Sequence, residues 1–285
     1  MRLVTSLNVL YDYTTEIDRA VSRLAAAGFD AIDFNGCDMM KPWRGPLGDD
    51  CLNQLQAAGQ RHGLPFTQAH GPMFNYWGEQ AAEDLADTFR CLEWCGQLGI
   101  PWMVMHPGTI TGGYGPAHRE QTLEANLAFF RQFVPVMETH GVGIAIENMA
   151  DGFRAGRMYG AVPAELVELC DALDHELFGL CWDTGHAFLQ GLPQREAIGS
   201  LGQRLKVIHV QDNDGKMDHH LLPYHGKIDW QTVVDGLKEA GYRGNWTYEV
   251  HAAVRFYPDE LRDAALKLAT AIGRHFLARL TPAPV

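Results

Sequence analysis

The chain has 285 residues, of which 46% are hydrophobic and 20% are charged, a balance typical of a globular protein. Its formal net charge of −12 disfavours nonspecific attraction to nucleic acid. No stretch approaches the roughly 18 consecutive apolar residues of a membrane span, and the N-terminus lacks a signal-peptide pattern. We therefore expect a cytoplasmic protein with no membrane partner.

No Pro-, Gly- or Ser-rich linker divides the chain, so we predict one domain over residues 1–280 and a loose tail over residues 281–285. The six cysteines form no CxxC pair. This spacing favours buried, reduced thiols over a zinc–thiolate or disulfide framework.

Short apolar runs alternate with longer helical patterns along the chain. The predicted strands cover residues 2–9, 30–35, 65–70, 102–106, 142–147, 178–183, 205–210 and 245–250. Eight such strand–helix units of about 35 residues each match an α/β fold of the (β/α)8 TIM barrel type. A doubly wound open sheet is the alternative, but the G-x-G-x-x-G that would follow its first strand is absent.

Two of the helical patterns carry local signals. Residues 16–27 form an amphipathic stretch that Thr14 or Thr15 can cap and that Gly28 ends. The apolar stripe after the fourth strand contains Pro135, which we expect to kink its helix.

Charged or imidazole side chains stand at the ends of six successive predicted strands. They are His70, His106, Glu147, Asp183, His209 and Glu249. In a (β/α)8 barrel these strand ends meet at one rim. Any one of the six alone could be a helix cap, an ion-pair member or a hydrogen-bonded histidine. Carboxylates gathered in a cleft, however, repel one another unless a cation lies among them.

Four of these residues supply three carboxylates and one imidazole: Glu147, Asp183, His209 and Glu249. This donor set suits one divalent ion such as Mn²⁺, Co²⁺, Mg²⁺ or Zn²⁺. A metal that chelates a carbonyl and its neighbouring hydroxyl acidifies the C–H bond between them. Glu147 and Glu249 are therefore the predicted catalytic acid–base pair. One of them acting alone would isomerise a sugar, both acting from opposite faces would epimerise it, and a β leaving group would give elimination.

Seven stretches resemble a known family. They are AHGP (69–72), HPG (106–108), IENMAD (146–151), CWDTGHAF (181–188), IHVQDN (208–213), DHHLLPYHGKIDW (218–230) and YEV (248–250). They are similar to those of the xylose-isomerase-like barrels, a family of sugar phosphate isomerases and epimerases that also includes endonuclease IV. The resemblance implies a metal on the same four ligands and His186 reaching a substrate oxygen. It leaves the reaction open.

The predicted substrate is a small sugar or keto-sugar, with His186, His70 and His106 as binding residues. Arg154 could grip an acidic substituent. Further cations that could do so are Arg157, Lys216, Lys227 and Arg255. Aromatic loop residues that could pack against a sugar are Trp43, Phe74, Tyr76, Trp77 and Phe153.

Ketohexose 3-epimerases of this family usually carry a second glutamate after the strand-five ligand and an arginine after the strand-seven histidine. Phe153 and Gly215 stand near those places here, which argues against an allulose- or tagatose-type activity. A lyase or dehydratase acting on a keto-sugar or inosose with the same ligands stays open.

An endonuclease IV-like zinc phosphodiesterase acting on abasic DNA is the other alternative. Nine residues that match that set could hold three zinc ions: His70, His106, Glu147, Asp183, His186, His209, Asp218, His220 and Glu249. The negative net charge and the few cations after the second strand oppose this function. We therefore expect no nucleic-acid partner, and we leave a homo-oligomer open.

Overall fold

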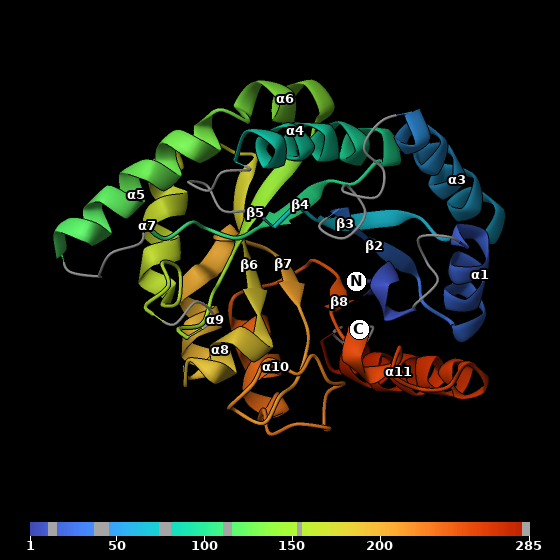
Figure 1. Ribbon diagram of the computed structural model, residues 1–285. Helices are drawn as coiled ribbons and strands as arrows, with labels where there is room; N and C mark the ends of the chain where they lie inside the picture. The colour runs from blue at the N-terminus through green and yellow to red at the C-terminus, as the bar shows by residue number, and fades with distance from the viewer. Residues whose placement is uncertain (11–15, 37–45, 74–80, 111–115, 153–155, 281–285) are drawn as a thin grey trace.

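The computed structural model describes residues 1–10, 16–36, 46–73, 81–110, 116–152 and 156–280, which form a parallel β-barrel surrounded by helices (Figure 1). The strands are β1 (Leu3–Ser6), β2 (Ala31–Asn35), β3 (Phe66–His70), β4 (Trp102–Met105), β5 (Gly143–Glu147), β6 (Phe178–Asp183), β7 (Leu205–His209) and β8 (Trp246–Tyr248). Neighbouring strands pair in parallel in the order β7-β6-β5-β4-β3-β2-β1-β8. The predicted TIM barrel is confirmed.

The helices follow the strands and cover the outside of the barrel (Figure 1). They are α1 (Ile17–Ala27), α3 (Pro46–His62), α4 (Ala81–Leu98), α5 (Pro116–Arg131), α6 (Val134–His140), α7 (Pro163–Leu173), α8 (Thr184–Leu189), α9 (Gln194–Leu201), α10 (Trp230–Glu239) and α11 (Asp259–Leu280). Short 3-10 turns are η1 (Leu7–Val9), η2 (Gly202–Arg204) and η3 (His251–Ala253). No helix in these described ranges is long and apolar enough to cross a bilayer.

Several predicted boundaries need correction. The first strand ends at Ser6 rather than at residue 9, because Leu7–Val9 turn into η1. The predicted kink at Pro135 is a complete break between α5 and α6. Pro135 lies in the first turn of α6, where its missing N–H loses no helical hydrogen bond.

The ends of α1 agree in part with the prediction. Gly28 ends the helix in the left-handed conformation, with φ of 97°, and its N–H reaches the carbonyls of Leu24 and Ala25. The N-cap position is Glu16, which makes no side-chain cap bond, rather than either predicted threonine. The threonines themselves, Thr14 and Thr15, and the tail over residues 281–285 lie outside the described residues.

The barrel closes between β7 and β8 through a short contact. An isolated parallel bridge joins Val210 to Tyr248. The Val210 N–H donates to the Thr247 carbonyl at 2.8 Å, and the Glu249 N–H donates to the Val210 carbonyl at 3.1 Å. This seam brings the ends of two strands that carry predicted metal ligands next to each other.

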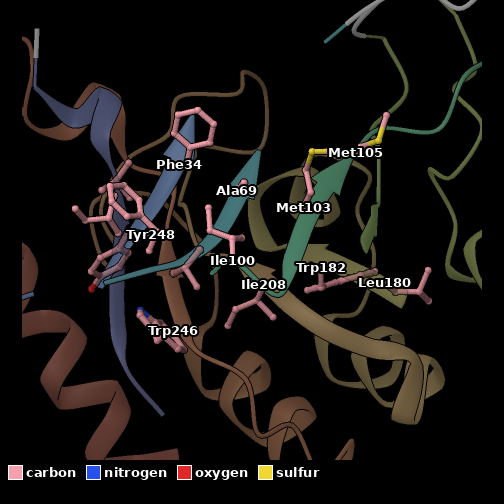
Figure 2. Close-up of a cluster of buried hydrophobic side chains, with 14 of the residues drawn as sticks. Phe34, Ala69, Ile100, Met103, Met105, Leu180, Trp182, Ile208, Trp246 and Tyr248 are labelled. Carbon is pink, nitrogen blue, oxygen red and sulfur yellow. The ribbon is translucent and has the colours of Figure 1, made fainter. Parts of the chain in front are cut away.

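Alternate residues of each strand face the helices, and they form the main hydrophobic core (Figure 2). Trp182, Trp246 and Tyr248 are among its largest fully buried side chains. The ring of Trp246 stacks on Phe276 of α11 at 4.6 Å between centroids. These contacts hold the helices against the barrel and leave the other strand face to form the barrel interior.

The barrel interior has two chemically different halves. Val104, Ala145, Cys181 and Val207, from β4 to β7, form a small buried apolar cluster. On the other side, the strand register places Ser6, Asp33 and Gln68 at paired positions on one face. The hydroxyl of Thr247 in β8 donates to the Gln68 carbonyl oxygen at 3.0 Å. The half built by β8, β1, β2 and β3 therefore contains these polar side chains beside the apolar Val4 and Ala31, which share the face of Thr247.

Candidate metal centre

Strands β5 to β8 bring the four predicted metal ligands together. Glu147 and Asp183 end β5 and β6, His209 ends β7, and Glu249 directly follows β8. Asp183 and His209 are register partners in neighbouring strands. One ligand atom from each of the four residues lies within 4.8 Å of the others. The residues that the sequence placed at one rim therefore converge on one point.

His209 lies at the centre of this group. Its Nδ1 is 2.8 Å from Glu147 Oε1 and 3.6 Å from Glu249 Oε2. Glu147, Asp183 and His209 are fully buried, whereas the Glu249 side chain is 13% exposed. Glu249 is therefore the most exposed of the four predicted ligands.

The carboxylates of the centre differ in how well their charge is compensated. Burial raises the pKa of a carboxyl, but at Glu147 the neighbouring His209, His106 and His70 outweigh burial, so its pKa lies well below the usual range. At Asp183 burial raises the pKa to about 7, although His186 opposes the shift. Asp183 Oδ2 is buried without a hydrogen-bond partner among the described residues. An unpaired buried oxygen beside two further carboxylates fits a divalent cation.

Asp183 has a local structural role as well. Its Oδ1 accepts a hydrogen bond from the His186 N–H at 2.6 Å, so Asp183 is the N-cap of α8. The side chain of Asn148 accepts from the Asp183 N–H at 2.6 Å and donates to its carbonyl at 3.0 Å. The helix-cap interpretation of Asp183 is correct, and it leaves the second carboxylate oxygen directed toward the ligand cluster.

Histidines around the centre are oriented by backbone carbonyls. Nδ1 lies 2.9 Å from the Gly71 carbonyl in His70, 2.8 Å from the Asn148 carbonyl in His186, and 2.9 Å from the Glu249 carbonyl in His220. A carbonyl only accepts hydrogen bonds, so Nδ1 carries the proton in each ring. This leaves Nε2 of each ring as the atom that faces the site.

Nε2 of four histidines around the site lies close to a carboxylate oxygen. His70 Nε2 is 3.5 Å and His106 Nε2 is 2.9 Å from Glu147 Oε2. His186 Nε2 is 3.5 Å and His220 Nε2 is 2.8 Å from Asp218 Oδ2. Each nitrogen–carboxylate pair needs a shared proton or a shared cation to be stable. The predicted binding residues His70, His106 and His186 therefore lie at the centre, in two groups around Glu147 and Asp218.

Other predicted substrate-binding residues do not reach the centre or lie outside the described part. Arg154 and all five predicted loop aromatics lie outside the described residues. Arg157 binds Asp151 at 3.4 Å and Glu165 at 2.7 Å, so it braces the loop before α7. Lys216 and Lys227 are exposed, and the Arg255 guanidinium lies over the Phe256 ring.

Two amides that the sequence reasoning missed hold the acidic ligands. Asn148 orients Asp183, as described above. Gln211 Nε2 lies 3.3 Å from Asp183 Oδ1 and 2.5 Å from Asp218 Oδ1. Gln211 is two residues after His209 and so shares its strand face, which is the signal that could have identified it. Gly185 allows this placement, because a Cβ there would lie 2.1 Å from the Gln211 side chain.

Among the described residues, no cysteine belongs to the groups that could hold a metal ion. Burial raises the pKa of the Cys181 thiol to about 12, so it stays protonated at neutral pH. The five described cysteines, Cys51, Cys91, Cys95, Cys170 and Cys181, are all free, and four of them are buried. This agrees with the prediction of reduced thiols, and Cys37 lies outside the described residues.

Comparison with known proteins places this site in context. A family model described as xylose isomerase-like TIM barrel matches residues 21–271. A probable endonuclease 4 from Methanoculleus marisnigri is 29% identical over 259 residues, covering 85% of this chain and 86% of that protein. An uncharacterized protein from Methanocaldococcus jannaschii is 31% identical over 163 residues, and the chain spans only about half, 54%, of its length.

Solved structures resemble the whole barrel. A D-tagatose 3-epimerase-like protein superposes with a TM-score of 0.79 at 23% identity, covering 98% of both chains. The IOLI protein, solved with a bound zinc atom, superposes with a TM-score of 0.74 at 18% identity, also covering 98% of both chains. At these identities the likeness shows the fold, and function has to be argued from the residues of the site.

Proposed function

Because the chain belongs to the xylose isomerase-like TIM barrel family, we propose that it is a divalent-metal-dependent sugar isomerase or epimerase. The observation that carries this proposal is the convergence of Glu147, Asp183, His209 and Glu249, whose ligand atoms lie within 4.8 Å of one another. The donor set suits one Mn²⁺, Co²⁺, Mg²⁺ or Zn²⁺ ion. The proposed substrate is a sugar or keto-sugar, and the proposed intermediate is an enediolate.

A divalent ion bound by these four residues would polarise a sugar carbonyl and so acidify the neighbouring C–H bond. The chain must then supply a base within reach of that proton. Two glutamates flank His209, and Glu249 is the more accessible of the two. Burial raises the pKa of Glu249, but His209 and His220 outweigh it and leave that pKa lowered, so Glu249 is an ionised base at neutral pH.

Of the two glutamates in the proposed acid–base pair, Glu147 is held more firmly by its neighbours. Its carboxylate contacts His209 through Oε1 and His106 through Oε2. Such contacts hold the carboxylate in place and keep it ionised. In an epimerisation, Glu249 would remove the proton from one face of the substrate and Glu147, or an acid it positions, would return one from the other. His186 would donate a hydrogen bond to a substrate oxygen.

Solvent exchange tests the proton transfer. The protein is incubated in D₂O with a panel of ketoses, aldoses, 3-keto sugars and inososes, and C–H exchange is followed by NMR. We expect Glu249→Gln or Glu147→Gln, with metal occupancy measured at saturating metal, to lose exchange by about 10²-fold or more while retaining the ion. The exposed variant Glu239→Gln serves as the control.

Full exchange in both metal-loaded variants would exclude the glutamates as the acid–base pair. Conversion without entry of deuterium would instead indicate a hydride shift or a shielded proton relay. The same panel separates isomerisation and epimerisation from elimination, because a lyase or dehydratase releases a product that has lost water.

A zinc phosphodiesterase is the second candidate, favoured by the orientation of the histidines. Nε2 of His70 and His106 faces Glu147, and Nε2 of His186 and His220 faces Asp218, as further metal ligands would. The similarity to the Methanoculleus marisnigri protein supports this candidate, while the net charge of −12 opposes a nucleic-acid partner. We therefore rank it second.

Metal analysis separates the two candidates. Protein purified without chelators is analysed for metal content and assayed on duplex DNA that contains an abasic site. One ion per chain with no incision supports the sugar enzyme. Three zinc ions per chain together with incision would reverse the ranking. In the sugar enzyme the additional histidines would bind substrate or orient the ligands through hydrogen bonds.

A further inference from the structure

Asp33 is a buried carboxylate inside the barrel, below the candidate metal centre. It lies on the interior face of β2, paired in register with Ser6 of β1 and Gln68 of β3. The residue is fully buried, and neither carboxylate oxygen has a hydrogen-bond partner among the described residues. A carboxylate in this position is costly unless something compensates it.

The neighbours of Asp33 on its own face are directed elsewhere. The Ser6 hydroxyl donates to Asn8 Oδ1 at 2.7 Å. The Gln68 carbonyl oxygen accepts from Thr247 at 3.0 Å. Burial raises the pKa of Asp33 to about 7, opposed by His209 and His70 and reinforced by Glu249 and Glu147. Gln68 Nε2 has no hydrogen-bond partner among the described residues, and it is not bonded to Asp33. The charged groups that act on Asp33 are those of the metal centre above it.

His209 presents that group. Its Nδ1 faces Glu147 and Glu249, while its Nε2 lies 3.9 Å from Asp33 Oδ2. This Nε2 is also buried without a hydrogen-bond partner among the residues that the structure describes. An N–H···O bond spans about 2.9 Å, so a shift of about 1 Å would close the pair.

We propose that Asp33 is a positioning residue for the metal centre, accepting a hydrogen bond from Nε2–H of His209 and so keeping Nδ1 free of its proton as the metal ligand. This role rests on the proposed metal site. A histidine ligand must offer a lone pair, and the partner of its other nitrogen decides which nitrogen does so. Asp33 is the described carboxylate on the Nε2 side of the ring.

A role in packing alone would not need a charge. The opposite half of the interior contains Val104, Ala145, Cys181 and Val207, which shows that this barrel accommodates small apolar side chains inside it. Asparagine would keep the size of Asp33 without burying a charge. The acidic group is thus explained by the imidazole that it faces.

Metal binding without turnover tests the proposal. Co²⁺ is titrated into metal-free protein, and the visible absorption of the bound ion reports the ligand geometry. We expect Asp33→Asn to weaken Co²⁺ binding 10- to 100-fold and to change the absorption spectrum. Without metal, the same variant should unfold at a temperature equal to or above that of the parent, because it no longer buries an uncompensated carboxylate.

The matched control is Gln68→Leu, which removes a buried polar group from the position paired with Asp33 and loses the hydrogen bond with Thr247. An Asp33→Asn affinity within about twofold of the parent, or a loss no greater than that of Gln68→Leu, would overturn the role of Asp33. If the parent protein binds no Co²⁺, the metal centre itself is wrong and the role falls with it. The parent titration therefore distinguishes the two failures.

Discussion

The two halves of the barrel interior are built differently and support different parts of the rim. The half from β4 to β7 is apolar, with Val104, Ala145, Cys181 and Val207 packed together. Three proposed metal ligands, Glu147, Asp183 and His209, lie above it at the strand ends. The half from β8 to β3 has the polar side chains of Ser6, Asp33, Gln68 and Thr247 at interior positions, together with the smaller apolar Val4 and Ala31.

The two halves therefore have different effects on the ligands above them. Close-packed apolar side chains leave little room for movement, so the strands beneath Glu147, Asp183 and His209 hold those ligands in fixed relative positions. The polar half is less completely paired, since Gln68 Nε2 and both Asp33 oxygens have no hydrogen-bond partner among the described residues. We infer that the apolar half sets the geometry of the ligands and the polar half sets their protonation.

The largest expected effect comes from a ligand above the apolar half. Asp183→Ala should weaken Mn²⁺ or Co²⁺ binding by about 10²-fold or more, because a ligand contributes at least as much as the outer residues that orient it. Asp183→Asn retains an N-cap side chain for α8, so it isolates ligation from helix capping. Calorimetric titration of metal-free protein measures both.

The matched change in the polar half is Thr247→Val, which should leave metal affinity within about threefold of the parent because it removes only the bond to Gln68. If Thr247→Val lost as much metal affinity as Asp183→Asn, the two halves would not differ in the way described.

Packing gives the second contrast. Val104→Ala should lower the free energy of unfolding by about 2 kcal/mol, from lost burial and the cavity left behind. The double variant Gln68→Leu/Thr247→Val should change it by less than about 1 kcal/mol, because both hydrogen-bonding partners are replaced together. Urea denaturation of metal-free protein checks both values. Equal losses would show that the polar half is packed as tightly as the apolar one.

Protonation gives the third contrast. Burial lowers the pKa of His220, but Glu249 and Asp218 outweigh it and raise the pKa to about 9. Burial is similarly outweighed at His186, mainly by Asp183, and at His209, by Cys181 and then by Glu147 and Glu249, so both pKa values lie well above the usual range. The folded chain therefore binds more protons than the unfolded chain above pH 6.5. The stability from these histidines is complete below that pH. The part from His220 is lost as the pH rises through 9, and the parts from His186 and His209 are lost as the pH rises through their own raised pKa values.

Metal-free protein should therefore have a lower Tm at pH 9 than at pH 7, by several degrees. Groups with lowered pKa values do not oppose this trend, because His106 and His251 titrate below pH 6.5 and the lowered carboxyls titrate lower still. Excess Mn²⁺ should reduce or reverse the slope, since metal binding displaces those protons. A Tm that stays flat in the presence of a chelator would contradict the assignment.

The smallest effect is expected outside the barrel. Arg195 and Glu239 form an ion pair on α9 and α10 with both side chains about half exposed. Glu239→Ala should change the free energy of unfolding by less than about 0.5 kcal/mol and leave metal affinity unchanged. Thermal denaturation measures the first and the Co²⁺ titration the second. A larger change would mean that surface pairs, rather than the interior halves, control the stability of the centre.

The strand positions and the convergence of the four predicted ligands were predictable because each depends on local pattern. An apolar run that ends in Glu147, Asp183 or His209 indicates both a strand and its functional end. Barrel topology then brings these ends together without further information. The break before α6 was only partly predictable: Pro135 signals an interruption, but a proline suits the first turn of a helix as well as a kink.

Asp33 and Gln211 could not be predicted in the same way. Asp33 lies in the middle of a short strand, where the sequence does not show whether a carboxylate meets solvent, an ion pair or a histidine 176 positions away. Gln211 contacts Asp218 through a loop whose course depends on packing around the buried Asp212, which accepts hydrogen bonds from Tyr224, Ile228 and Trp230. Both contacts depend on tertiary structure.

The short seam between β7 and β8 has a consequence for local unfolding. One isolated bridge closes the barrel there, whereas ladders of two or more register pairs join the other neighbouring strands. Backbone hydrogen exchange should therefore begin at this seam, because local opening there breaks the fewest contacts. His209 and Glu249 lie on its two sides. An ion that both of them bind would therefore connect β7 to β8 where the barrel has its shortest strand pairing. Because the ion binds only the closed barrel, cation binding would stabilise the β7–β8 seam against local opening, and the barrel would then unfold more cooperatively with the ion than without it.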